Sequence, residues 1–450
     1  MKSLIRWRGW CILALFWAGA VNLAGQDQPL PANIVVLLAD DLGWGDVSYH
    51  NATVRTPNLE RLRQRGLELD QQYVMPQCTP TRVALLSGRY PSRFGLHACQ
   101  ASNARSLPPK TPTLASLLQA QGYATGLFGK WHLGSKMEWG PKHYGFDFSY
   151  GSLAGAVGML DHRYRLNSPY SRTWHRNHEW LQEEGHVTDL TVREVLAFLQ
   201  RNRNQPFFLY VPFHTVHTPL VEEAKWFEGL DHVTSKDRKL YLAAVRHLDW
   251  AVGQIVAEID RLQLSQRTYI LFLSDNGAQV RHSGNQYPAP DPALKNFSSN
   301  APLRGEKTQV YEGGIRVPAL LSGPGIEAGS RFEAPLHAVD WLPTFLAAAG
   351  GEVRMQNFKL DGQNLLPWLQ GKASRPLGPR NFYWLWGSKG QRAAVRRGPW
   401  KWLRNGANRP WELYRIDQDP LETKELSAQF PEEAAACQKF FQQMQAMDAP

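Results

Sequence analysis

Long apolar segments are scarce in this chain of 450 residues. The one at the N-terminus, from Cys11 to Leu23, falls short of the ~20 residues that a membrane-spanning helix needs. Basic residues precede it and small residues follow it, which is typical of a signal peptide over residues 1–25. A transmembrane anchor is the alternative for this segment. No later segment is apolar enough to span a bilayer, so we expect a soluble, exported protein. Its compartment would be periplasmic, extracellular or lysosomal, depending on the organism.

The sequence also lacks any block of lysine and arginine interleaved with aromatic residues. This absence argues against a nucleic-acid partner. The formal net charge falls from +10 to +7 when the signal segment, with Lys2, Arg6 and Arg8, is removed. Such a modest and dispersed positive excess suits an anionic substrate. Charged residues of both signs make up 20% of the chain, which argues against long disordered regions.

Cysteine is rare, with four residues in the whole chain. The sequence shows no Cys/His spacing of the kind that binds zinc. Export would remove Cys11 and leave Cys78, Cys99 and Cys437 in a compartment that permits disulfides. If Cys78 is committed to chemistry, Cys99 and Cys437 are the remaining pair, and a bond between them is a hypothesis.

The length of the chain allows a large core and a smaller second unit, and no internal repeats are found. The pattern changes after about residue 340, so we expect a main domain over residues 26–350 and a C-terminal subdomain over residues 351–450. Within the latter, residues 381–416 are aromatic and strand-like, and residues 428–447 have a helical pattern. This predicts a small antiparallel sheet with a closing helix.

Short, continuous apolar stretches in the main domain are typical of strands that are buried on both faces of a sheet. The stretches are Asn33–Ala39, Tyr123–Phe128, Phe207–Phe213, Tyr269–Leu273 and Ile315–Leu321. Helical patterns separate most of them, so the sheet should be mostly parallel and flanked by helices. The expected fold class is therefore α/β, with a large, mostly parallel sheet and the smaller antiparallel C-terminal sheet.

A polar cluster follows each of the first four stretches. The clusters are Asp40-Asp41, Lys130 with His132, His214 with His217, and Asp275-Asn276. In parallel sheets, ligands bind outside the carboxyl ends of the strands, so these clusters would meet at one edge. Two adjacent acids repel each other unless a cation joins them, and an exposed turn is the alternative for the acid pair. Four separate turns explain this chemistry less well than one polar site.

The stretch Cys78-Thr79-Pro80-Thr81-Arg82, followed by Gly88-Arg89, is an unusual pattern in an exported chain. Helical spacing resumes over residues 81–88, which places Cys78 at or just before a helix N-terminus. There the unpaired amides and the helix dipole favour a negative group. Taken alone, the motif is explained equally well by a buried free thiol in a loop.

Together these motifs resemble the sulfatases of the alkaline phosphatase superfamily, over about residues 32–425. The Cys78 motif resembles the family's modification signature, with Thr81 where serine is common. Other blocks that resemble the family are Gly129–Gly134, Ser274–Gly277, Tyr311–Gly314, Trp400–Trp402 and Glu412–Tyr414. Among sulfatases, the similarity is to arylsulfatases of the N-acetylgalactosamine-4-sulfatase type, and a Cys99–Cys437 bond is similar to one in that group. The resemblance implies an alkaline-phosphatase-like fold and a sulfuric ester hydrolase.

The resemblance also implies the chemistry. A maturation enzyme would oxidise Cys78 to formylglycine, whose hydrated diol attacks sulfur with one hydroxyl and later expels sulfate with the other. One calcium ion per chain would be bound, because the expected ligands are hard oxygen atoms. These ligands are Asp40, Asp41, Asp275, Asn276 and the modified Cys78.

The resemblance gives further residues a function in catalysis. Arg82 would hold the diol, and Lys130 and Lys307 would bind sulfate oxygens. His132 would act as a base, and His217 would protonate the leaving alcohol. Two of these residues have rivals, which are His214 for His217 and Arg304 for Lys307.

Two other functions compete with a sulfatase. A phosphodiesterase or phosphonate monoester hydrolase of the same superfamily is the alternative enzyme. An inactive, carbohydrate-binding relative is a third possibility, since several of the 17 tryptophans could stack on sugar rings. We expect a sulfated saccharide as the substrate, with a pocket formed by loops 135–180 and 278–302 and by the C-terminal aromatic residues.

Overall fold

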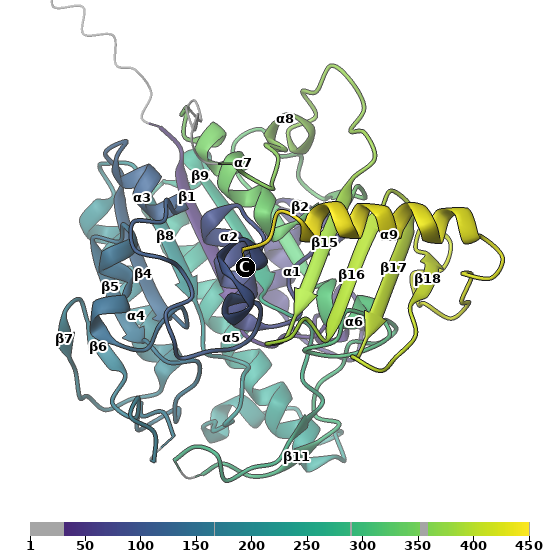
Figure 1. Ribbon diagram of the computed structural model, residues 1–450. Coiled ribbons are helices and arrows are strands. Elements are labelled where there is room, and N and C mark those ends of the chain that lie inside the picture. The colour runs from purple at the N-terminus through teal and green to yellow at the C-terminus, as the bar shows by residue number, and fades with distance from the viewer. Residues whose placement is uncertain (1–30, 166, 289, 352–358, 450) are drawn as a thin grey trace, which may run out of the picture. The chain divides into compact units, whose positions relative to one another are not determined.

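The computed structural model describes residues 31–165, 167–288, 290–351 and 359–449 (Figure 1). The predicted signal peptide, residues 1–25, lies outside these residues. The described part of the chain forms one compact unit that begins at Pro31. None of the helices in this part combines the length and hydrophobicity that crossing a bilayer requires.

A ten-stranded mixed sheet forms the centre of the unit. Four of its strands coincide with predicted apolar stretches, namely β1 Asn33–Ala39, β4 Ala124–Lys130, β8 Phe207–Pro212 and β9 Thr268–Ser274. They lie side by side in the order β9-β1-β8-β4 and run parallel. The predicted α/β fold with a large, mostly parallel sheet is confirmed.

Helices cover both faces of this sheet, which explains why the central strands are apolar throughout. In β1, Ile34, Val36 and Leu38 point into one hydrophobic cluster, while Val35 and Leu37 point into the other. The first cluster includes residues of α2 Cys78–Ser87, α3 Leu114–Gln119 and α7 Trp341–Ala348. The second includes residues of α1 Pro57–Gln64, α4 Val187–Asn202 and α5 Lys236–Arg261.

The strands at the two edges of the sheet were not all expected. Residues 135–180 were expected to be a loop, but they contain β5 Phe148–Ser152, β6 Trp174–Arg176 and β7 Glu179–Trp180. These strands are short and carry polar and glycine residues, so they lack the apolar signal of the central strands. At the other edge, β2 Leu67–Leu69 and β13 Ser330–Phe332 lie beyond β12.

The expectation of a strand over Ile315–Leu321 was correct only in its second half. Strand β12 covers Ala319–Ser322 and runs antiparallel to β9. At its predicted beginning, Ile315 is instead the last residue of the short helix α6 Glu312–Ile315, and residues 316–318 connect this helix to β12. The Gly313-Gly314 pair permits this turn, since a side chain at Gly314 would collide with the Gln309 carbonyl oxygen, 2.1 Å from its Cβ position.

The predicted C-terminal sheet and closing helix are confirmed. The sheet consists of β15 Asn381–Trp386, β16 Arg392–Arg397, β17 Trp400–Asn405 and β18 Glu412–Arg415, all antiparallel. Helix α9 Pro431–Gln445 lies across its strands (Figure 1). The first hydrophobic cluster extends from the main sheet into this sheet. The division of the chain near residue 350 stays a prediction.

The hypothesis of a Cys99–Cys437 disulfide is wrong, because both residues are buried free thiols in the structure. Cys99 has Arg93 and Asp448 as its charged neighbours. Cys437 on α9 instead lies beside Arg397 of β16. The two sulfur atoms therefore lie in different surroundings, and neither is placed to bridge to the other.

Candidate active site

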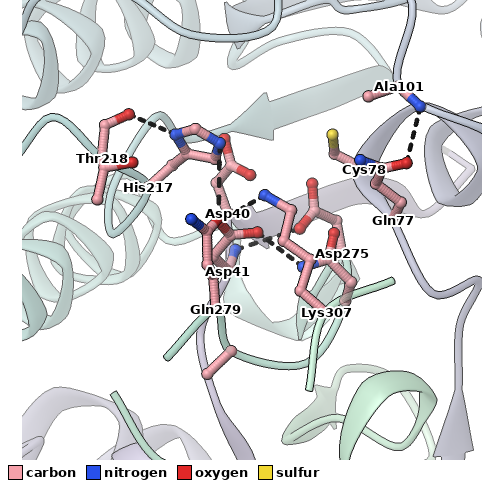
Figure 2. Close-up of polar contacts among 12 residues, drawn as sticks. Asp40, Asp41, Gln77, Cys78, Ala101, His217, Thr218, Asp275, Gln279 and Lys307 are labelled. Carbon is pink, nitrogen blue, oxygen red and sulfur yellow. Dashed lines mark hydrogen bonds and ion pairs between the residues drawn. The ribbon is translucent and has the colours of Figure 1, made fainter. Parts of the chain in front are cut away.

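The polar residues at the carboxyl ends of four parallel strands lie together, as the sequence predicts. Asp40 and Asp41 follow β1, Asp275 follows β9, and Lys130 is the last residue of β4. Figure 2 shows the three carboxylates grouped with Lys307 and His217, with Cys78 at the side of this group. Parallel pairing explains the arrangement, because it brings all four strand ends to the same edge.

The expected oxygen ligands are buried and close to one another. Asn276 donates a hydrogen bond from Nδ2 to Asp41 Oδ1 (2.7 Å), and the Asp41 amide donates to Asp275 Oδ1 (3.2 Å). In contrast, Asp40 Oδ1 and Asn276 Oδ1 are buried without any hydrogen-bond partner. Leaving such atoms unpaired is costly, and a hard cation bound between them would satisfy both. The residues present therefore fit a calcium ion.

Two lysines balance the charge of the adjacent carboxylates. Lys130 Nζ lies 2.6 Å from Asp40 Oδ2, and Lys307 Nζ lies 2.7 Å from Asp41 Oδ2. Burial raises the pKa of Asp40 to about 7, although Lys130 opposes the shift. Burial would also raise the pKa of Asp41, but Lys307 and His217 outweigh it and hold the pKa well below its usual range. The two neighbouring carboxyls thus differ in their affinity for a proton.

Cys78 is the first residue of α2, which confirms its predicted place at a helix N-terminus. Its side chain is buried, and Sγ lies 3.2 Å from Nδ1 of His132. Burial raises the pKa of the Cys78 thiol, although Lys130 and Lys307 act in the opposite direction. Cysteines that act as nucleophiles have a lowered pKa. The raised pKa disfavours the thiolate form of Cys78.

Arg82, one helical turn after Cys78, is fully buried and connects two strand ends. One guanidinium nitrogen lies 2.8 Å from Asp275 Oδ2, and another donates to the Lys130 carbonyl oxygen (2.7 Å). Its Nε is buried without a partner. Arg82 thus holds the Asp275 carboxylate in place. Its contact with a diol at residue 78 stays a prediction.

The structure separates the two histidines that competed for one function. His217 lines the cleft beside Cys78 and Lys307, and its Nε2 lies 3.7 Å from Asp41 Oδ2. His214 does not line this cleft and instead bonds through Nε2 to the Ser152 hydroxyl (2.7 Å). Of the two, only His217 is placed to reach a bound substrate.

The structure also separates Lys307 from Arg304. Lys307 lines the cleft and contacts Asp41, as described above. Arg304 bonds to the Tyr414 hydroxyl (2.9 Å), and its guanidinium lies 3.9 Å from the centre of the Tyr311 ring. Arg304 therefore faces the C-terminal sheet. Of these two residues, Lys307 is the one that lies in the site.

A family model described as Sulfatase matches residues 32–351 of the chain. This chain belongs to the sulfatase family. It is 33% identical over 384 residues to the N-acetylgalactosamine-6-sulfatase of Canis lupus familiaris, a match that covers 81% of this chain and 70% of that protein. It is 32% identical over 445 residues to the steryl-sulfatase of Homo sapiens, covering 81% of this chain and 73% of that protein.

Solved structures agree with this assignment. The crystal structure of Ps i-CgsB superimposes with a TM-score of 0.84 at 30% identity, and the match covers 93% of this chain and 94% of that chain. Another crystal structure, of Ps i-CgsB in complex with k-i-k-neocarrahexaose, has a TM-score of 0.84 at 31% identity with the same coverage of both chains. The resemblance to sulfatases is confirmed, and the chain is a sulfuric ester hydrolase.

The site of this sulfatase lies in a cleft of about 470 Å³. Loop residues form its wall, as predicted for residues 135–180 and 278–302, with Tyr164 and Tyr287 as examples. The expected contribution of the C-terminal aromatic residues is wrong, because none of those described lines this cleft, and no described tryptophan does so either. Those rings are used in packing, as for Trp384, whose Nε1 donates to the Val74 carbonyl oxygen (2.8 Å).

Sequence reasoning missed two residues that position the site. A Cβ atom at Gly155 would lie 2.2 Å from Nε2 of His132, so only glycine allows the loop to pass this ring. Gln77, the residue before Cys78, accepts a hydrogen bond from the Ala101 amide (2.8 Å; Figure 2). It accepts a second one from Nε1 of Trp386 (2.8 Å), and the two bonds fix its side chain. Neither residue forms part of a pattern, although Gln77 is a neighbour of the Cys78 motif.

Proposed function

We propose that this sulfatase is exported and removes sulfate from a sulfated carbohydrate, using a formylglycine formed from Cys78 and a bound calcium ion. The observation that carries the proposal is the arrangement of Cys78, which lies between His132 and a buried group of lysines and carboxylates at the end of an open cleft. The high pKa of the encoded thiol adds support, because it favours a modified residue over a thiolate as the nucleophile.

Calcium would be held by Asp40, Asp41, Asp275 and Asn276, together with the modified Cys78. Support comes from the two buried oxygens that lack a partner, Asp40 Oδ1 and Asn276 Oδ1. Bound there, the ion supplies positive charge that orients an anionic oxygen and stabilises developing negative charge. Lys130 and Lys307 neutralise the carboxylates. Lys307 also lines the cleft, so a sulfate oxygen could reach it directly, whereas Lys130 lies buried behind Asp40.

The two histidines of the site would move protons at different atoms. His132 presents Nδ1 to the side chain of residue 78, so it accepts a proton from the group that replaces the thiol. His217 donates from Nδ1 to the Thr218 carbonyl oxygen (2.5 Å), which leaves Nε2 for the proton that the departing alcohol receives. Burial, followed by the charge of Lys307, lowers the pKa of His217 and disfavours the protonated ring, whereas the Asp41 carboxylate, 3.7 Å from Nε2, favours the protonated ring that this function needs.

The carbohydrate part of the proposal rests on the relatives and on the cleft. N-acetylgalactosamine-6-sulfatases are among the relatives, and the Ps i-CgsB structure contains a carrageenan oligosaccharide. The cleft is open and is lined by tyrosine, asparagine and glutamine side chains, which suit the hydroxyls and faces of sugar rings. Export rests on the N-terminal segment, and formylglycine requires a maturation enzyme in the host.

The test compares the wild-type protein with Cys78→Ala. Mass spectrometry of the peptide that contains residue 78 first measures conversion to formylglycine. Sulfate release is then assayed on 4-nitrophenyl sulfate and on sulfated saccharides, with bis(4-nitrophenyl) phosphate as the rival substrate. We expect sulfate release by the wild type, its loss in Cys78→Ala and after calcium chelation, and recovery on adding Ca²⁺. Retained turnover in Cys78→Ala, or preference for the phosphodiester, would refute the proposal.

N-terminal sequencing of the exported protein tests removal of residues 1–25.

A further inference from the structure

We propose that Arg165 and Arg281 form a second anion-binding position at the wall of the cleft. The preferred substrate is then a saccharide that carries a further anionic group, a sulfate or a carboxylate, besides the sulfate ester that is cleaved. We call these two side chains the cationic rim. The inference rests on the proposed function and deepens it, because it names the class of saccharide.

Among the described residues of the cleft, the charges of the cationic rim are only partly balanced. Both arginines line the same cleft as Cys78 and Lys307. Lys307 is paired with Asp41, whereas neither rim arginine has an ion-pair partner among the described residues. Glu306 is the only acidic residue in the described lining of the cleft, and it accepts a hydrogen bond from the Val280 amide (3.3 Å). Two cations with one nearby acid favour an anionic ligand.

Arg165 is held in place by uncharged neighbours, although its side chain is exposed. Its guanidinium lies 5.7 Å from the centre of the Tyr164 ring and 5.6 Å from that of Tyr287. One guanidinium nitrogen donates to Gln286 Oε1 (2.8 Å). A stacked and hydrogen-bonded arginine loses less freedom when it binds an anion than a mobile one does. These contacts therefore prepare Arg165 for a ligand without neutralising it.

The loop that carries Tyr287 and Arg281 is fixed by a buried ion pair. His282 Nε2 lies 2.6 Å from Asp291 Oδ1, and both side chains are almost fully buried. The other carboxylate oxygen of Asp291 accepts hydrogen bonds from the amides of Gln286 (2.7 Å) and Tyr287 (3.0 Å). These contacts hold His282, Gln286 and Tyr287 around Asp291, which gives the backbone beside Arg281 and the Tyr287 ring a defined position.

The tyrosine that stacks on Arg165 of the cationic rim also lies near His217, the proposed general acid. The Tyr287 ring lies 6.5 Å from that of His217, which would protonate the leaving alcohol. The alcohol is the saccharide, so the part of the substrate beyond the cleaved ester lies on the side of Tyr287 and Arg165. A group bound by the cationic rim therefore belongs to the leaving saccharide and not to the departing sulfate.

The experiment uses matched pairs of disaccharides that share the cleaved sulfate ester and differ by one additional sulfate. The pairs include N-acetylgalactosamine and galactose as the sugar that is desulfated. For the wild type, the double variant R165Q/R281Q and the control R203Q, two quantities are measured at low and high NaCl. These are kcat/KM from sulfate release and Kd from calorimetry with the Cys78→Ala form of each protein. Arg203 is an exposed arginine after α4 that does not line the cleft.

We expect the wild type and R203Q to prefer the disulfated member about tenfold in both quantities, because each charge-assisted contact strengthens binding. This preference should shrink at high NaCl and disappear in R165Q/R281Q. The inference is overturned if the wild type shows no preference or if R165Q/R281Q keeps it. If no disaccharide and no aryl sulfate is hydrolysed while calorimetry still shows the preference, the cationic rim stands and the proposed function falls.

Discussion

The sulfur of Cys78 lies 3.2 Å from Nδ1 of His132, and both side chains are buried. The His132 ring reaches this position from a backbone with positive φ (56°), two residues after the end of β4. On its far side the ring touches the chain at Gly155, where a Cβ atom would come within 2.2 Å of Nε2. The backbone conformation of His132 and the chain at Gly155 therefore both hold the imidazole against residue 78.

Gly155→Ala should displace the His132 ring and lower activity. A misplacement of about 1 Å can reduce the rate about 10²-fold, so we expect a fall of that order in kcat/KM for 4-nitrophenyl sulfate. Gly378→Ala is the matched control, because nothing lies within 4 Å of its Cβ position. Circular dichroism should show that both variants are folded. Equal activity of the two variants would mean that Gly155 does not position His132.

His217→Ala should affect substrates according to their leaving group. Loss of a general acid lowers the rate by about 10²–10⁴-fold when the leaving alcohol needs a proton. The loss should approach this range for a saccharide sulfate and be much smaller for 4-nitrophenyl sulfate, whose leaving group departs as an anion. Kinetics on both substrates provide the measurement. His214→Gln is the control, and because His214 lies outside the cleft it should slow both substrates alike. Equal losses in His217→Ala would exclude a general-acid function.

Much of this architecture could be predicted, because the relevant signals are local. Strands β1, β8 and β9 are continuous apolar runs that are buried on both faces, and polar residues follow each of them. The parallel sheet then determines that Asp40, Asp41 and Asp275 meet. The β15–β18 sheet was predicted for the same reason, since its aromatic strands are separated by recognisable turns.

The features that could not be predicted lie mainly in loops, because no hydrophobic periodicity specifies the path of a loop. Lys307 could be separated from Arg304 only by seeing which side chain turns toward Asp41. The cationic rim joins residues 165 and 281, which a sequence pattern cannot connect. Composition alone suggested that tryptophans could stack on sugar rings, whereas Trp384 proves to pack in the core. Burial and pairing, not residue type, determine which of these side chains face a ligand.

Lys401→Met should strongly destabilise the protein. Lys401 Nζ lies 2.8 Å from both Glu312 Oε1 and Glu422 Oε1, and all three side chains are essentially buried. Burial, with the nearby Glu312, already raises the pKa of Glu422 to about 7 although Lys401 opposes this. Removing one partner of a buried ion pair costs about 3–5 kcal/mol, which urea unfolding would measure. The exposed Lys424→Met is the control, and a loss no larger than in this control would contradict the prediction.

A double variant separates charge from packing at this position. In Lys401→Met with Glu422→Gln, the carboxylate that loses its counter-ion is removed, whereas Glu312 keeps Arg316, whose guanidinium nitrogen lies 3.9 Å away. The free energy of unfolding should therefore recover part of the loss seen in Lys401→Met alone. If the double variant is less stable than the single one, the lysine stabilises through its packing and not through its charge.

The stability of the fold should depend on pH through His247. His247 on α5 lies between two carboxylates, with Nδ1 2.7 Å from Glu222 Oε2 and Nε2 3.4 Å from Asp189 Oδ1. Its ring also lies 4.5 Å from that of His186 and 4.3 Å from the indole of Trp226. Burial would lower the pKa of His247, but the bonds to Asp189 and Glu222 outweigh it and raise the pKa above its ordinary value. The folded protein therefore binds a proton here more tightly than the unfolded chain does.

His247→Asn should remove this contribution. A raised histidine pKa stabilises the fold fully below the pKa of the unfolded residue, about 6.5, and this stabilisation is lost as the pH rises through the higher pKa of the folded state. The difference in unfolding free energy between wild type and His247→Asn should thus be largest at acidic pH and decline toward alkaline pH. Urea titrations that follow tryptophan fluorescence at several pH values test this. The exposed His232→Asn, as control, should show little dependence. A difference that grows with pH would mean that His247 is neutral in the fold.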